Sequence, residues 1–484
     1  MKTDLRQESG TDLVKGCHPN IVGFREFFLK LLFIVESIQF FRDLFRSDVL
    51  QRLLEDPENR ILIATTYESV AIDAEFSHPR LRVYPLKLVP PSFINRLTAP
   101  LLKDLYALEH PSDTFAQHRQ TTAQRLNKKQ GLRLVLAGFL HECGLRSSWL
   151  ISMGEEFGSD PLFSSLLVKE KPDAVLFSTM IPYNLECLRE TKRHGIPLIL
   201  AVTSWDHPTS KGPLTATPDG ALVWSEEMRR ELAVSHDLGP DTIIPVGVLY
   251  FETYFRRENL LSKAEFSSEL GIDPGVKIIH YATGDSSLIR CNQEFIRILQ
   301  RIVVSGQLGQ PCHLLVRVSP KDLFHLYEEF ENSPETTVQY PKGKGSLYGS
   351  NQWLPSSDED CHRASTILHS DVILSVSSSM VLDAVCFDKP IVNLAYDAGL
   401  QLEFWDSVDR FYRYSHARPV LESDSTWVVK NEAELVKALG EALLFPEGKK
   451  EERRVLLERI IQFNDGKTSQ RWVEAIRQLL QPAL

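Results

Sequence analysis

The chain has 484 residues, of which 43% are hydrophobic and 24% charged, so it can bury the cores of about two or three soluble domains. Its net charge of −10 argues against a nucleic-acid binder, which would need clustered lysines and arginines to neutralise phosphates. The seven cysteines are scattered without a CxxC pair, which favours a reduced cytoplasmic chain and predicts no metal site.

The N-terminal residues are polar and lack the order of a signal peptide, so we expect residues 1–26 to form a disordered leader. The apolar stretch Glu26–Phe41 is interrupted by Lys30 and Glu36. It is also shorter than the roughly 20 residues that a membrane-spanning helix needs. We therefore expect no membrane span here.

Apolar runs of strand length alternate with helical periods along most of the chain, a pattern typical of βαβ units and parallel sheets. The stretch from Phe40 to Arg60 is one such helical segment and should end at Asp56-Pro57. The first set of expected strands is Leu29–Val35, Arg60–Thr66, Leu81–Leu88, Ala174–Phe177, Pro197–Val202 and Ala221–Trp224. The second set is Thr242–Pro245, Val276–Tyr281, His313–Val318, Thr336–Gln339, Asp371–Ser375 and Ile391–Leu394.

These two sets predict an α/β protein with two Rossmann-like parallel-sheet domains that face a cleft. We place the N-terminal domain at residues 27–240 and the C-terminal domain at residues 241–430. The segment Gly247–Lys263 has no clear period and is the expected linker. Residues 431–484 are predicted to be helical and to pack back across the domains.

A basic segment lies in the first half, because no acidic residue occurs from Thr114 to Leu140. Its charged residues are Arg119, Arg125, Lys128, Lys129 and Arg133. A solvated helix face is one interpretation. The other is a peripheral contact with a membrane surface, where each basic residue gains about 1 kcal/mol from anionic lipid.

Ligands of open parallel sheets bind beyond the carboxyl ends of the strands, so the first candidate is SVSSSMVLDA, which follows an expected strand. Ser378 and Ser379 at a helix start could seat a phosphate, although capping of the helix is an alternative role. Asp383, further along that helix, could accept hydrogen bonds from a sugar or ribose hydroxyl. It could equally make a buried hydrogen bond to the backbone.

The first two strands of the second domain supply further donor-binding candidates. Thr283 and Gly284 lie in a small, hydroxyl-rich loop after the first of these strands, and they could line a phosphate. Arg317 ends the next strand, where its guanidinium could clamp a diphosphate in a bidentate manner. A surface ion pair is the alternative for Arg317.

The densest group of acids and bases is the loop TSWDHPTSKG, which follows a strand of the first domain. Asp206 or His207 could take a proton from an acceptor hydroxyl, and Trp205 could stack against a sugar or polyol. Lys211 belongs to the same loop. A purely structural loop with a satisfied aspartate and an exposed histidine is the alternative.

These motifs resemble the GT-B glycosyltransferase superfamily, and within it the bacterial group of CDP-glycerol glycerophosphotransferase-like and surface-polysaccharide transferases. The stretches that carry the resemblance are SDVILSVSSSMVLDAVCFDKPIVNLAYD, TSWDHPTSKG, ALVWSEEMRREL with IIPVGVLYFETYF, and DGKTSQRWVEAI. The resemblance implies that Ser378 and Ser379, with Asp383 nearby, hold the donor diphosphate. It also implies that Asp206 and Lys211 face the acceptor.

The chain departs from the glycerophosphotransferase pattern at three places. Val376-Ser377 replace the Asp-Tyr pair of that group, Ser319-Pro320 replace its His-Pro, and Asp206 replaces the histidine after the loop tryptophan, unless His207 takes that role. The resemblance therefore favours transfer of a sugar over transfer of glycerophosphate.

The sequence thus predicts a metal-independent glycosyltransferase that moves a sugar from a nucleotide diphosphate donor to a cell-surface glycan or lipid-linked acceptor, in polysaccharide biosynthesis of the cell envelope. We expect no cofactor, since the nucleotide-linked donor is a substrate. The expected location is cytoplasmic and peripheral at the inner face of the membrane. The alternatives are a CDP-glycerol-type glycerophosphotransferase, a nucleotide-sugar epimerase or hydrolase, and a non-catalytic binding protein.

Overall fold

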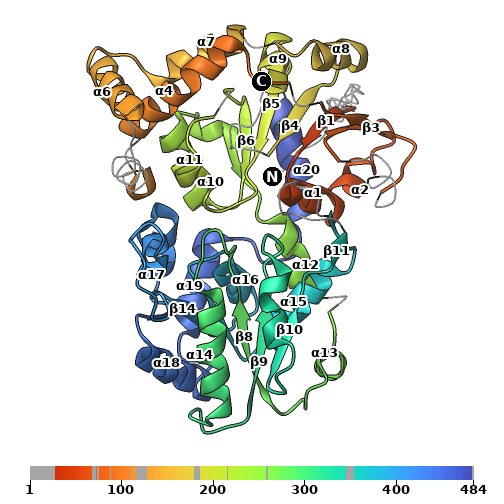
Figure 1. Ribbon diagram of the computed structural model, residues 1–484. Helices are drawn as coiled ribbons and strands as arrows, with labels where there is room; N and C mark the ends of the chain where they lie inside the picture. The colour runs from red at the N-terminus through yellow and green to blue at the C-terminus, as the bar shows by residue number, and fades with distance from the viewer. Residues whose placement is uncertain are drawn as a thin grey trace, which may run out of the picture.

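Two parallel β-sheets form the framework of the protein in a computed structural model (Figure 1). The structure describes residues 28–67, 72, 76–87, 89–110, 112–115, 128–157, 159–178, 186–214, 216–257, 260–344 and 354–481. The expected leader, residues 1–26, lies outside the described residues, as do Arg119 and Arg125. The α/β class with two Rossmann-like domains is confirmed.

The first sheet has seven strands in the described part of the chain, in the order β3-β2-β1-β4-β5-β6-β7. Their bounds are β1 (Lys30–Val35), β2 (Arg60–Thr65), β3 (Leu81–Pro85), β4 (Ala174–Phe177), β5 (Leu198–Ala201), β6 (Gly220–Val223) and β7 (Ile243–Pro245). Strands β4, β5 and β6 are buried along their whole length, as expected for parallel strands that are covered on both faces.

The second sheet has six strands in the described residues, in the order β10-β9-β8-β13-β14-β15. Their bounds are β8 (Lys277–Ala282), β9 (Cys312–Arg317), β10 (Thr336–Gln339), β13 (Val372–Ser375), β14 (Ile391–Leu394) and β15 (Trp427–Val429). A separate antiparallel pair joins β11 (Gly343–Lys344) to β12 (Leu354–Pro355).

One predicted strand belongs to the other sheet, and the short strands β11, β12 and β15 were not predicted. Strand β7, which we expected in the second sheet, pairs with β6 and forms the edge of the first sheet, which therefore extends beyond residue 240. Strand β15 was not predicted, because its three residues are too few to show a period. The other expected strands all form, with ends that differ by at most a few residues.

Helices surround the first sheet. They are α1 (Ile38–Phe45), α2 (Val49–Leu53), α4 (Phe93–Glu109), α6 (Lys128–Glu142), α7 (Ser147–Phe157), α8 (Pro161–Glu170), α9 (Glu186–Arg193), α10 (His207–Ser210), α11 (Glu226–His236) and the 3-10 helix η1 (Pro240–Thr242). The single helix expected after β1 is instead two helices, and the Ser47 hydroxyl bonds to the Asp43 carbonyl oxygen between them.

Further helices follow β7. They are η2 (Leu249–Phe251), α12 (Glu252–Arg256), α13 (Lys263–Leu270), α14 (Asn292–Val304), η3 (Phe324–Phe330), α15 (Glu359–His369), α16 (Met380–Cys386), η4 (Val408–Arg413), η5 (Ser415–Ala417), α17 (Arg418–Glu422), α18 (Glu432–Leu444), α19 (Lys450–Ile460) and α20 (Thr468–Leu480). None of the described helices has both the length and the apolar character needed to cross a membrane.

The two domains are joined by packed segments. The linker between β7 and β8 carries buried aromatic side chains, among them Phe251 and Tyr254, in an apolar cluster that reaches both sheets. The C-terminal helix α20 returns to the first domain, where Trp472 lies in the core (Figure 1). It approaches β6 so closely that a Cβ on Gly220 would lie 2.8 Å from Leu479. The last helix of the tail therefore packs on the first domain.

Candidate functional site

The loop after β5 holds Asp206 in a fixed position at the start of α10. The hydroxyl of Ser204 donates to one carboxylate oxygen at 2.5 Å, and the hydroxyl of Ser210 donates to the other at 2.8 Å. Lys211 forms an ion pair with the same carboxylate at 3.2 Å. Asp206 is therefore held by three partners from its own loop.

The electrostatics of this loop separate the roles of Asp206 and His207. Burial alone would raise the pKa of Asp206, but its neighbours His207 and Lys211 hold that pKa below its ordinary value. Burial lowers the pKa of His207 to about 4, although Asp206 opposes that shift. At neutral pH, His207 is thus an uncharged imidazole. Its lowered pKa makes it a weaker base than an ordinary histidine, and Asp206 is weaker still.

Residues of the second domain complete this cluster. The ring of His416 in η5 meets Trp205 edge to face, with centroids 5.1 Å apart. Lys321, which follows β9, lies close enough to lower the pKa of His207 further. Trp205 is only 7% exposed, so its ring packs against His416 and does not present an open wall to an acceptor.

Sequence reasoning missed His416 and Lys321. The signal for His416 was the aromatic and basic run RFYRYSHARP, which follows β14 and has neither a strand nor a helix period. Lys321 stands in SPKD directly after β9, where a ligand-binding residue is expected.

The serine turn, formed by Ser377, Ser378 and Ser379, lies between β13 and α16. Ser377 has a left-handed φ of 26°, and its N–H donates to the Tyr412 hydroxyl at 3.2 Å. The Ser378 hydroxyl accepts the N–H of Met380, so one serine caps the helix. Ser379 is exposed and makes no capping bond, so its hydroxyl stays available to a ligand.

Asp383 has a structural partner. Its carboxylate is 3% exposed and accepts the hydroxyl of Tyr254, from the linker helix α12, at 2.6 Å. The sequence left open a buried hydrogen bond to the backbone, whereas the donor is the side chain of Tyr254. The carboxylate is thus oriented toward the linker.

Thr283 and Gly284 hold the loop after β8 in place. The Thr283 hydroxyl accepts the N–H of Ser319, and the Gly284 N–H donates to the Asn292 side chain. A Cβ on Gly284 would lie 2.4 Å from Ile289, so this glycine is required by packing. The carboxylates of Asp285 and Asp322 accept further loop N–H groups, which makes this loop a poor seat for phosphate.

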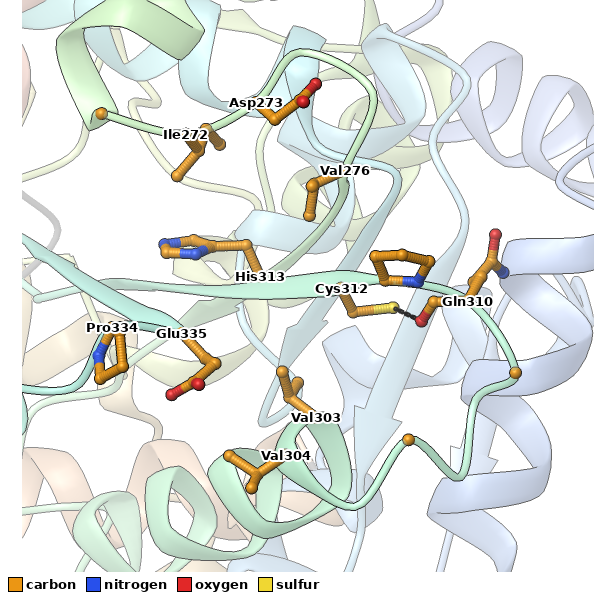
Figure 2. Close-up of a pocket in the computed structure, with 14 residues that line it drawn as sticks. Ile272, Asp273, Val276, Val303, Val304, Gln310, Cys312, His313, Pro334 and Glu335 are labelled. Carbon is orange, nitrogen blue, oxygen red and sulfur yellow. Dashed lines mark hydrogen bonds between the residues drawn. The ribbon is translucent and has the colours of Figure 1, made fainter.

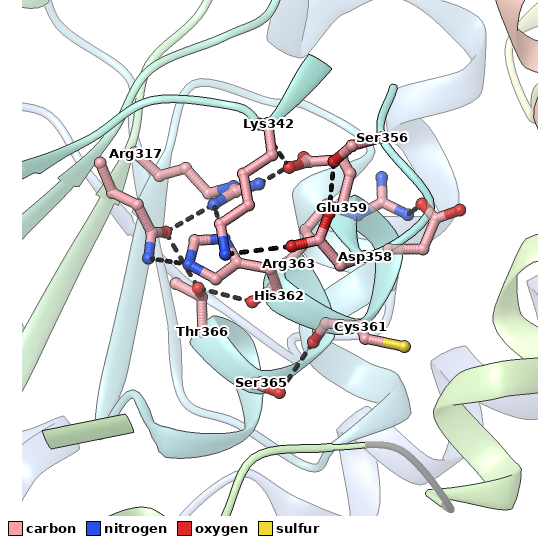
Figure 3. A network of polar contacts seen from close by, with 12 residues as sticks. Arg317, Lys342, Ser356, Asp358, Glu359, Cys361, His362, Arg363, Ser365 and Thr366 are labelled. Atoms are coloured by element: carbon pink, nitrogen blue, oxygen red, sulfur yellow. Dashed lines mark hydrogen bonds and ion pairs between the residues drawn. The ribbon is translucent and has the colours of Figure 1, made fainter. Parts of the chain in front are cut away.

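Arg317 is buried in a polar network, and its guanidinium is engaged within the second domain (Figure 3). It donates to the Glu359 carboxylate and to the Gln339 side-chain oxygen, each at 2.5 Å, and lies 3.3 Å from the His362 ring. The alternative of an ion pair therefore describes Arg317, although the pair is buried and not on the surface. This geometry offers no support for a diphosphate clamp.

The candidate site is thus smaller than the predicted set of residues. The segment from η4 to η5 contacts both the serine turn and the loop after β5. Tyr412 contacts Ser377 of the turn, and His416 contacts Trp205 of the loop. Arg317 and Asp383 face other partners.

A separate open groove of about 630 Å³ lies where β8 and β9 begin (Figure 2). Its lining includes Asp273 and Glu335 but neither lysine nor arginine. Burial also lowers the pKa of His313, which leaves that lining residue uncharged at neutral pH. The groove is therefore poorly suited to an anionic ligand. Within the described ranges, no group of three or more His, Cys, Asp or Glu side chains could hold a metal ion.

Solved structures with the same architecture are known, although no protein-family model and no curated protein matches the chain. A Listeria monocytogenes protein assigned as a UDP-N-acetylglucosamine 2-epimerase has a TM-score of 0.54 at 11% identity, over 95% of this chain and 98% of its own. The UDP-GlcNAc 2-epimerase of Neisseria meningitidis, bound to UDP-GlcNAc, has a TM-score of 0.53 at 10% identity, over 93% and 100%. A glycosyltransferase of Rickettsia africae has a TM-score of 0.51 at 9% identity, over 94% and 100%. The chain has a GT-B-like fold.

Proposed function

We propose that the protein is a glycosyltransferase of the GT-B type that moves a sugar from a nucleotide diphosphate donor to a glycan or lipid-linked acceptor. The observation that carries the proposal is the contact of one segment, η4 to η5, with both the serine turn and the loop after β5. In this arrangement His207 of the first domain and the serine turn before α16 of the second domain contact the same ligand. The fold neighbour that is bound to UDP-GlcNAc supports a nucleotide-linked donor.

In this proposal His207 is the general base. Its imidazole is neutral above pH 4 or so and accepts the proton of the acceptor hydroxyl as that oxygen attacks the sugar carbon. Asp206, which Lys211 and two serines hold in place, positions the loop on which His207 stands. The sequence offered Asp206 or His207 for this role, and we propose His207.

The departing nucleotide diphosphate needs compensation for its growing negative charge. We assign that role to Ser379, to the backbone at the start of α16, and to Lys321, which is exposed and electrostatically coupled to His207. Breaking the bond between sugar and phosphate places the negative charge on the diphosphate, and the acceptor proton passes to His207.

The test is a turnover assay with a panel of UDP-, GDP-, CDP- and TDP-linked sugars, with and without an extract of lipid-linked and polymeric glycans. Sugar should appear in the glycan fraction only when both substrates are present. His207→Gln should reduce this rate at least about a hundredfold, whereas His325→Gln, at an exposed histidine of η3, should leave it unchanged.

Two outcomes would replace this proposal. Conversion of the nucleotide sugar without any acceptor would indicate an epimerase or hydrolase, the activity class of several fold neighbours by their names. The absence of both turnover and nucleotide binding would indicate a non-catalytic protein.

A further inference from the structure

Helix α6 turns an apolar row of side chains outward. Leu132, Val135, Leu136 and Phe139 are 73%, 71%, 48% and 65% exposed. Their spacing of i, i+3, i+4 and i+7 places them along one stripe of the helix. Single exposed apolar residues are common on soluble proteins, but a contiguous stripe of this kind marks an interaction surface.

The helix is held in this orientation by its other contacts. Ala137 is buried in a small cluster with Leu102, Leu105 and Leu150 from α4 and α7. Arg133 forms an ion pair with Asp104 of α4 at 2.5 Å. In Figure 1, α4, α6 and α7 form an outer layer of the first domain, at a distance from the second domain. The stripe therefore faces outward on a supported helix.

The charge of this region is opposite to that of the whole chain. No acidic residue occurs from Thr114 to Leu140, and α6 begins with Lys128 and Lys129, although the chain as a whole carries a net charge of −10. Outward apolar side chains combined with local positive charge characterise helices that lie in the plane of a membrane surface. Anionic lipid head groups supply the complementary charge.

We propose that α6 docks the protein onto an anionic lipid bilayer, with the stripe formed by Leu132, Val135, Leu136 and Phe139 buried at the level of the head groups. The described helices include none that could span the bilayer, so this contact is peripheral. A second copy of the chain fits the surface less well, because a symmetric contact would oppose two basic segments. The proposal does not depend on the reaction that the protein catalyses.

The test is sedimentation of the full chain with vesicles of phosphatidylcholine that contain phosphatidylglycerol, and with vesicles of pure phosphatidylcholine. Wild type should bind the anionic vesicles and bind the neutral ones several-fold more weakly. Leu136→Glu with Phe139→Glu should lower binding to anionic vesicles at least about tenfold. Lys128→Gln with Lys129→Gln should lower it several-fold and reduce its dependence on salt.

The matched control replaces another exposed apolar pair, at the end of α18. Leu444 and Phe445 are 64% and 68% exposed, and changing both to glutamate should leave vesicle binding unchanged. Thermal unfolding of every variant verifies that it is folded. The proposal is overturned if wild type does not sediment with anionic vesicles, or if the control pair weakens binding as much as the α6 pair. It is also overturned if wild type is a dimer that does not bind vesicles and the α6 substitutions convert this dimer to a monomer.

Discussion

The buried His280 makes the stability of the second domain depend on pH. It lies within β8 with no exposed surface, and neither ring nitrogen has a hydrogen-bond partner in the described part of the chain. Burial lowers its pKa from 6.5 to about 3, and the nearby Arg317 adds to the shift. Between pH 6.5 and about pH 3, the histidine is protonated in the unfolded chain and neutral in the native state. This contribution to stability is present above pH 6.5 and is lost as the pH falls toward 3.

Replacing this histidine should remove that dependence. Relative to wild type, His280→Leu should gain about 2 kcal/mol more in free energy of unfolding at pH 5 than at pH 7. Urea unfolding at the two pH values measures the difference. His325→Leu, at an exposed position, should show no such change. An equal effect of His280→Leu at both pH values would show that the native state takes up the proton.

Asp383 should act on stability and not on ligand binding. Tyr254→Phe leaves a buried carboxylate without its donor and should lower the free energy of unfolding by about 1–3 kcal/mol. Calorimetry of the variant should still show unchanged affinity for a nucleoside diphosphate. If Tyr254→Phe loses affinity for the nucleoside diphosphate but keeps the stability of wild type, Asp383 contributes to ligand binding after all.

At the level of elements, the network around Arg317 ties β9 and β10 to α15. Arg317→Met leaves the buried Glu359 without its cation and should destabilise the protein by about 3–5 kcal/mol. The exposed pair of Arg297 and Glu329 is a control, since Arg297→Met should cost less than about 1 kcal/mol. Chemical unfolding compares the two variants, and equal losses would contradict the structural role of the network.

The same elements show what local sequence can and cannot predict. Strand positions were predictable because buried parallel strands are continuous apolar runs, as β4 and β5 illustrate. The sheet to which β7 belongs was not predictable. Strands of both sheets are similarly apolar, so the sequence of β7 does not indicate that it pairs with β6. The end of β9 at Arg317 was predicted, but its partner Glu359 follows 42 residues later and has no local signal.

At the level of the whole molecule, the candidate site depends on the packing of the two domains. The loop around Asp206 and His207 was identifiable from its density of polar residues after a strand. His416 was not, because it reaches Trp205 only when η5 packs against α10 across the domain interface. An apolar cluster that includes residues of β5, the linker and α16 holds this interface together.

We propose that the serine turn and the loop after β5 form one nucleotide diphosphate site, which calorimetric titration with UDP can detect. Ser378→Ala with Ser379→Ala should weaken UDP binding at least about tenfold, because hydrogen bonds to a charged ligand are lost. His207→Gln should bind UDP as wild type does, since its role is in the chemical step. If the serine variant keeps the UDP affinity and the thermal stability of wild type, the serine turn is not part of a nucleotide site.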